Sequence, residues 1–134
     1  VNHDRRSPHV LTGRAEAGSS LKIVAGAPVK KGAQILIAYG LPTTGQHRFI
    51  QDYGFLDPDP RANAAVALAL QPGGGGSRGG LALSESERLE TLARLAETTV
   101  EEDERLLEEG GMDGGEELAV RFRVGIKRAL LDAA

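Results

Sequence analysis

The chain has 134 residues, of which 40% are apolar and 26% charged, with a formal net charge of −3. These values are typical of one ordinary globular domain or two small ones, and they exclude a wholly disordered chain. Cysteine is absent, which excludes disulfides, thiolate metal sites and a cysteine nucleophile, and favours an intracellular location.

Charge divides the chain into two unlike parts. Residues 1–57 carry seven basic and four acidic groups, whereas residues 58–134 carry nine basic and fifteen acidic groups. Neither part has the basic stripe with interleaved aromatic residues that is typical of nucleic-acid binding. The longest apolar run, AAVALAL, is too short to span a membrane. We therefore expect neither a nucleic acid nor a membrane as partner.

The first 57 residues predict short strands followed by a short helix. Residues 1–20 are irregular, residues 21–25 alternate as a strand does, and residues 34–40 (QILIAYG) form a second predicted strand. Both faces of this second strand are apolar, so we expect it to be buried on both sides. Residues 43–54 predict a short helix that ends at Gly54 in the C′ position.

The remaining residues are mainly helical in pattern. Residues 64–70 (AAVALAL) fit either a strand or a short apolar helix, and residues 73–80 (GGGGSRGG) predict a flexible loop. Ser84 or Ser86 begins a helix whose apolar stripe is Leu89, Leu92 and Leu95. Thr99 with Glu102 forms a capping-box pattern before a second helix. A Gly-rich turn leads to a third helix with Leu118, Phe122, Ile126 and Leu130 at helical spacing, which predicts an antiparallel hairpin. The fold class expected is α+β.

Few residues carry a recognisable chemical pattern. The three histidines have no metal-ligand spacing, and no G-x-S-x-G motif is present. The acidic run at residues 101–104 is interpreted as a solvated helix start. Asn2, Tyr39 and Tyr53 each have an ordinary structural interpretation as turn, core and helix-cap residues, although the only two tyrosines both precede glycine.

Taken together, these motifs resemble a known family. An Asn-His pair at residues 2–3, the stretch VKKGAQILIAYG ending at Gly40, and DYGF at residues 52–55 resemble the C-terminal half of a SET-domain methyltransferase. The closest resemblance is to the group that includes the Rubisco large-subunit lysine methyltransferase. The tail, from TTVEED to the RFRVGIKRALL helix, resembles the start of the helical substrate-binding domain of that group.

The resemblance implies roles for five residues. Asn2 and His3 would contact S-adenosylmethionine, Tyr39 would be the catalytic tyrosine, Tyr53 would line the channel for the substrate lysine, and Phe55 would close the cofactor pocket. It also implies that residues 1–57 are the C-terminal portion of the SET domain, with a threaded, knot-like segment, and that residues 58–134 begin the helical substrate-binding domain. No metal is implied.

The implied function is transfer of a methyl group from S-adenosylmethionine to a lysine of a non-histone protein. The chain begins at VNHD, without a secretory or transit segment, and we expect it to be a fragment that lacks the first half of the cofactor site. We expect a monomer that binds a protein substrate. The plastid, cytoplasm and nucleus all stay open as its compartment, and the substrate is not identified.

Three alternatives remain. A histidine methyltransferase of the same group would differ only in its channel walls. A non-catalytic SET-like binding module is suggested by Asp4, His9 and Gln46, which stand where the family usually has Ser or Cys, Asn, and Asn. A helical scaffold unrelated to SET domains is the third.

Overall fold

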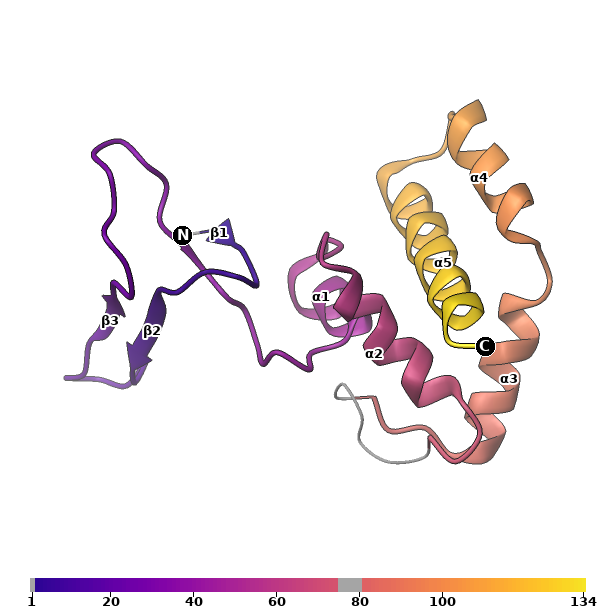
Figure 1. Cartoon of the computed structure of the whole chain (residues 1–134), viewed down its shortest axis with the longest axis horizontal. Helices are drawn as coiled ribbons and strands as arrows, with labels where there is room; N and C mark the ends of the chain where they lie inside the picture. Colours follow the sequence, from indigo (N-terminus) through magenta and orange to yellow (C-terminus); the bar gives the residue numbers. More distant parts are fainter. Residues whose placement is uncertain (1, 75–80) are drawn as a thin grey trace. The chain divides into compact units, whose positions relative to one another are not determined.

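The computed structural model describes residues 2–74 and 81–134, which contain five helices and a few short strands. The predicted α+β class is therefore confirmed. The chain separates into two compact units, residues 1–42 and residues 43–134 (Figure 1). The first unit holds the strands and the second unit holds the helices.

The first unit contains two small sheets. Strand β1 (Asn2–His3) pairs in parallel with β4 (Leu36–Ile37), and β2 (Val10–Gly13) pairs antiparallel with β3 (Leu21–Val24). The strand predicted at residues 21–25 is thus confirmed. The β2–β3 hairpin leaves its apolar side chains exposed on both faces.

The predicted strand at residues 34–40 is much shorter in the structure. Only Leu36 and Ile37 pair, and Ile37 is the one buried apolar side chain among the described residues of this unit. Ile35 is 40% exposed and Ala38 is also exposed. The expectation of burial on both faces was wrong, because such burial needs apolar side chains packed on each face of the sheet, and Ile37 is the one buried apolar side chain described in this unit.

The second unit is a helical assembly. Its helices are α1 (Gln46–Tyr53), α2 (Pro60–Leu70), α3 (Glu85–Leu95), α4 (Val100–Glu109) and α5 (Gly114–Asp132). Gly54 ends α1 with a left-handed φ of 72°, and its N–H donates to the Ile50 carbonyl, as predicted. The AAVALAL run is helical because Asp59 caps α2 and Pro60 occupies its first turn.

The core of this unit lies between α2 and α5. Val66, Leu70 and Ile126 are fully buried, and apolar residues of α3 and α5 pack against them. Gly125 allows the two helices to approach closely, because a Cβ atom there would lie 2.7 Å from the Asn63 amide nitrogen. Burial of each large apolar side chain contributes roughly 1.5–3 kcal/mol, so this contact dominates the stability of the unit.

The predicted helix starts are largely confirmed. Ser84, rather than Ser86, caps α3, and Thr99 with Glu102 forms the predicted capping box of α4. Helices α4 and α5 pack against each other after the Gly-rich turn (Figure 1). The stripe predicted for α3 was wrong at Leu89, which is 53% exposed. Arg88 is buried there instead, since it donates to the Leu70 carbonyl (3.1 Å).

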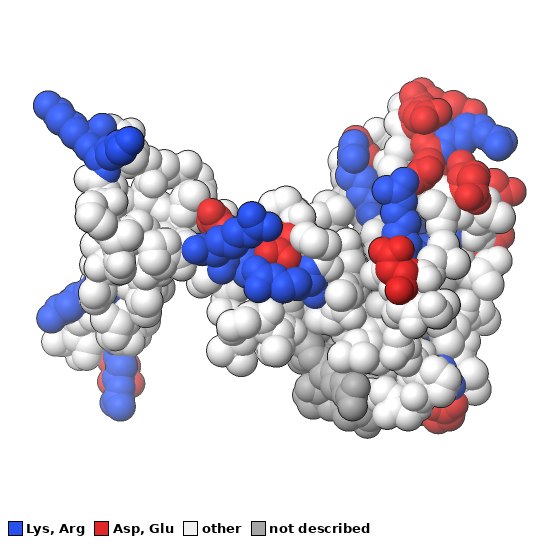
Figure 2. Space-filling model, viewed as in Figure 1, with Lys and Arg blue, Asp and Glu red and all other residues white. Residues whose placement is uncertain are grey.

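Most of the loop predicted at residues 73–80 lies outside the described residues. Within residues 2–74 and 81–134, no helix is both long and apolar enough to cross a bilayer. Basic and acidic groups are unevenly divided between the two units as well. Residues 1–42 carry six basic and two acidic groups, and residues 43–134 carry ten and seventeen (Figure 2).

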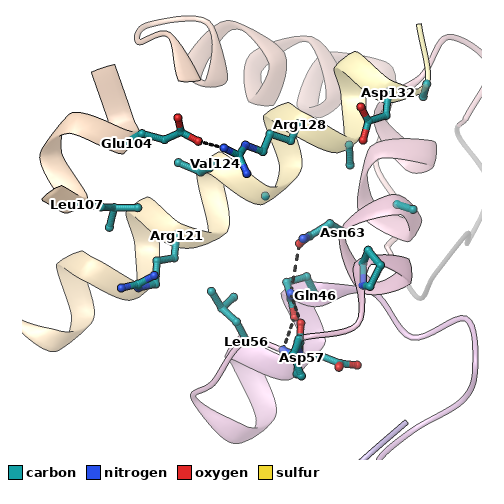
Figure 3. Close-up of a pocket in the computed structure, with 16 residues that line it drawn as sticks. Gln46, Leu56, Asp57, Asn63, Glu104, Leu107, Arg121, Val124, Arg128 and Asp132 are labelled. Atoms are coloured by element: carbon teal, nitrogen blue, oxygen red, sulfur yellow. Dashed lines mark hydrogen bonds and ion pairs between the residues drawn. The ribbon is translucent and has the colours of Figure 1, made fainter. Parts of the chain in front are cut away.

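The buried side chain of Gln46 links α1 to the chain segment that precedes α2. This side chain is 2% exposed, its Nε2 donates to the carbonyl of Asp57 (2.9 Å), and its Oε1 accepts from the Asp57 N–H (2.8 Å). The same Nε2 donates to Asn63 Oδ1 (3.2 Å) (Figure 3). Gln46 thereby joins α1 to the segment before α2, which is consistent with α1 lying in the second unit, residues 43–134. The domain boundary expected at residue 57 stays a prediction.

Replacing Gln46 with methionine tests this link. Gln46→Met keeps the side-chain volume but leaves the buried N–H and carbonyl of Asp57 without the Gln46 amide, so we expect a loss of about 2–4 kcal/mol in the free energy of unfolding. Chemical denaturation followed by circular dichroism at the helical band measures it. Gln51→Met, at an exposed glutamine of the same helix, is the control. Equal stability of the two variants would contradict the prediction.

Candidate functional site

Two of the residues implied by the family resemblance, His3 and Tyr39, contact each other in the first unit, and Asn2 precedes His3 in the same strand. Parallel pairing of β1 with β4 places Asn2 opposite Leu36 and His3 opposite Ile37, two residues before Tyr39. The Tyr39 N–H donates to His3 Nδ1 (3.0 Å), and the two rings lie 5.1 Å apart between centroids. Tyr39 is half-buried and Asn2 is exposed. Residues 36 positions apart in sequence thus form one cluster.

The other two implied residues belong to the second unit. Tyr53 and Phe55 surround the end of α1 together with Phe49, with ring centroids 5.7–6.1 Å apart. Phe49 is 0% exposed and anchors this aromatic cluster, whereas Tyr53 is half-exposed. Convergence of this cluster and Tyr39 on one channel stays a prediction.

The residues that depart from the family pattern make structural hydrogen bonds. Asp4 Oδ1 accepts from the Arg6 N–H (2.8 Å), and the Asp4 N–H donates to the Ile37 carbonyl (3.0 Å). His9 Nδ1 accepts from the Gly26 N–H (3.2 Å). These contacts hold the segment after β1 in place, so the departures keep a local structural role.

A pocket of about 810 Å³ lies within the second unit, between the segment that precedes α2 and helices α4 and α5 (Figure 3). Its floor is formed by small and apolar residues such as Ala64, Val124 and Gly125. Arg128 at the wall is paired with Glu104 across the two helices. The pocket has the size for a small ligand or a peptide side chain.

Sequence reasoning missed an ion cluster centred on Asp103. The acidic run was interpreted as solvated, but Asp103 is 0% exposed. Its carboxylate accepts from Arg123 Nε (2.8 Å), Lys127 Nζ (2.7 Å) and Thr98 Oγ1 (2.8 Å). The interpretation was wrong because Asp103 lies on the face of α4 that packs on α5. The Arg-x-x-x-Lys spacing in α5, with both residues on one helix face, was the signal available.

The pKa of the Asp103 carboxyl is strongly perturbed. Burial opposes its ionisation, but the hydrogen bonds from Arg123, Lys127 and Thr98 outweigh burial and lower the pKa from 3.8 to about 2. Perturbed groups often mark functional sites. Here the carboxylate, which belongs to α4, is enclosed by partners from α5 and from the turn before α4, so the cluster serves to hold these elements together.

Comparison with known proteins assigns neither a family nor a function to this chain. A scan of protein-family models and searches of curated proteins and solved structures found no match to this chain. In the described part of the chain, no group of three or more His, Asp or Glu side chains is arranged to hold a metal ion.

The low pKa of Asp103 gives a pH-dependent stability. Because the folded-state value is below the unfolded value, the contribution is complete above about pH 4 and is lost as the pH falls towards 2. Asp103→Asn should lower the free energy of unfolding by about 3 kcal/mol at pH 6. That deficit should shrink by about 2 kcal/mol at pH 2.

Denaturant unfolding of both proteins at pH 6 and pH 2, followed at the helical circular-dichroism band, checks this. Glu108→Gln, at an exposed position of α4, is the control and should show no such change. A deficit that is equal at the two pH values would show that the pKa of Asp103 is not lowered in the folded state.

Proposed function

We propose that this chain contains the C-terminal part of the catalytic domain of a protein-lysine N-methyltransferase of SET type, followed by the start of its substrate-binding region. The observation that carries the proposal is the contact between His3 of the Asn-His pair and Tyr39, in which the Tyr39 N–H donates to His3 Nδ1 (3.0 Å). A motif for the methyl donor and a candidate catalytic tyrosine, far apart in sequence, are held together by this contact.

The side chains of Asn2 and His3 suit the binding of the methyl donor. Asn2 is exposed and offers an amide that both donates and accepts hydrogen bonds, as an adenine edge requires. Nδ1 of His3 is engaged by the Tyr39 backbone, which fixes the plane of the imidazole ring. S-adenosylmethionine would supply an activated methyl group on a sulfonium. Under the resemblance, the segment that holds its methionine moiety would precede residue 1.

The reaction needs a neutral amine. Free lysine has a pKa of about 10.4, and both desolvation in a channel and repulsion by the sulfonium lower it. The amine lone pair forms the new N–C bond as the S–C bond breaks, and the products are a methylammonium and a thioether. The Tyr39 phenol would aim the amine at the methyl carbon, which is an orientation effect. Under the resemblance, Tyr53 would line the lysine channel and Phe55 would close the cofactor pocket.

The target would be a protein segment that presents a lysine, and the helical unit would help to hold it. The pocket beside α5 provides a concave surface for such a segment (Figure 3). The exposed apolar side chains of the β2–β3 hairpin also fit the proposal. A two-stranded sheet of this kind needs further strands or a packing layer, which the rest of a catalytic domain would provide.

A second candidate is a binding module without catalysis. It is favoured by Asp4, His9 and Gln46, which depart from the family pattern and whose hydrogen bonds hold backbone segments of the chain together. Such a module would bind a protein partner but not S-adenosylmethionine.

Tyr39→Phe separates these candidates. In the full-length protein that contains these residues, incubated with radiolabelled S-adenosylmethionine and a cell extract depleted of endogenous methylation, we expect label on a protein band. Tyr39→Phe should lower the transfer rate by about 10²-fold, as loss of one precisely placed polar group does. Binding of S-adenosylmethionine, measured by calorimetry, should be unchanged.

Arg94→Gln is the control, because Arg94 is exposed on α3 and pairs only with its helix neighbour Glu90 among the interactions described. We expect this variant to transfer label to the protein band at the same rate as the unmodified protein. If the protein neither labels a target nor binds S-adenosylmethionine, the enzyme proposal fails and the binding module stands. Amino-acid analysis of the labelled band distinguishes methyl-lysine from methyl-histidine.

A further inference from the structure

Ser7 belongs to neither the family motif nor the implied site, yet it touches the strand that leads to Tyr39. Its Oγ donates to the Leu36 carbonyl (2.5 Å) and accepts from the His9 N–H (3.1 Å). The contact with Leu36 is half-buried and spans 29 residues of sequence. We infer that Ser7 is a positioning residue, which sets the place of the Tyr39 phenol through the backbone of β4.

The shortness of the sheet explains why a side chain is needed. Strand β4 is two residues long and pairs only with β1 in the described part of the chain, so its ladder is too short to fix residues beyond its end. Tyr39 lies two residues after β4. Its backbone position therefore depends on individual hydrogen bonds rather than on a continuous ladder.

Three such bonds come from β1 and the segment that follows it. The Ser7 hydroxyl binds the Leu36 carbonyl, the Asp4 N–H binds the Ile37 carbonyl (3.0 Å), and the His3 imidazole binds the Tyr39 N–H (3.0 Å). Of the three, the Ser7 and His3 bonds use side chains. His3 is already implied in the proposed site, so Ser7 is the member that can be altered without removing an implied cofactor contact.

The hydroxyl of Ser7 is also held rigidly. It uses both its donor and its acceptor capacity, since it donates to Leu36 and accepts from His9. The Ser7 N–H donates to the Asp4 carbonyl (3.0 Å), and His9 Nδ1 in turn accepts from Gly26 in the turn after β3. The Ser7 hydroxyl thus joins β4 to the segment between β1 and β2, and the His9 imidazole joins that segment to the turn after β3.

The inference rests on the proposed function, and its test has two readouts. The first is kinetic, in the full-length protein. Ser7→Ala should lower kcat for methyl transfer by about tenfold, the effect of losing one ordinary hydrogen bond, with KM for S-adenosylmethionine unchanged. Ser7→Thr, which keeps the hydroxyl, should restore kcat. Ser19→Ala, at an exposed serine of the turn between β2 and β3, is the matched control and should behave like the unmodified protein.

The second readout does not require activity. This readout uses the 134-residue chain, which has two tyrosines, so Tyr53→Phe leaves Tyr39 as the single tyrosine signal after ¹³C-tyrosine labelling. In that background Ser7→Ala should shift or broaden the Tyr39 resonance, whereas Ser7→Thr and Ser19→Ala should not.

An unchanged Tyr39 resonance in Ser7→Ala overturns the inference, whatever the activity. A shifted resonance with unchanged kcat overturns the catalytic part of it. Absence of methyl transfer in the unmodified protein is the failure of the proposed function, and the resonance then still shows whether Ser7 positions Tyr39. Thermal unfolding of each variant, monitored by circular dichroism, identifies any loss of kcat that comes from misfolding.

Discussion

The apolar contact between α2 and α5 is the constraint on which the helical unit depends. Val66 and Leu70 of α2 meet Ile126 of α5, and the close approach at Gly125 makes this contact possible. Helix α4 is then joined to α5 by the Asp103 ion cluster, while Gln46 fastens α1 to the segment before α2. Apolar burial provides the stability, and the satisfied polar groups fix how the helices are arranged.

The strand unit is held together by hydrogen bonds rather than by an apolar core. Ile37 is its one buried apolar residue among those described, and each of its sheets has two strands. Its order therefore comes from side-chain to backbone hydrogen bonds, in which His3, Ser7 and His9 each engage a distant segment. A small unit with little core is marginal without further packing, so each of these bonds carries a large share of its stability.

The proposed methyl transfer depends on these side-chain to backbone hydrogen bonds of the strand unit. Methyl transfer between two bound molecules requires orientation more than strong acid or base groups, and a misplacement of about 1 Å is costly. Tyr39 sits just after a two-residue strand, so its precision is supplied by the neighbouring segment rather than by a rigid sheet. This distinguishes the site from one built on long strands, in which the ladder itself fixes the catalytic side chain.

The sequence by itself determined the local structure of the helices. Helix starts were predicted at Thr99 with Glu102 and at Ser84 or Ser86, and a helix end at Gly54, because caps act through bonds within a few residues. It also singled out Asn2, His3 and Tyr39 through their motifs. Only the tertiary structure decided that Asp103 is buried, that β4 is two residues long, and that the Ser7 hydroxyl donates to the Leu36 carbonyl. Each of these depends on which distant segment packs nearby, and neither periodicity nor local propensity encodes that partner.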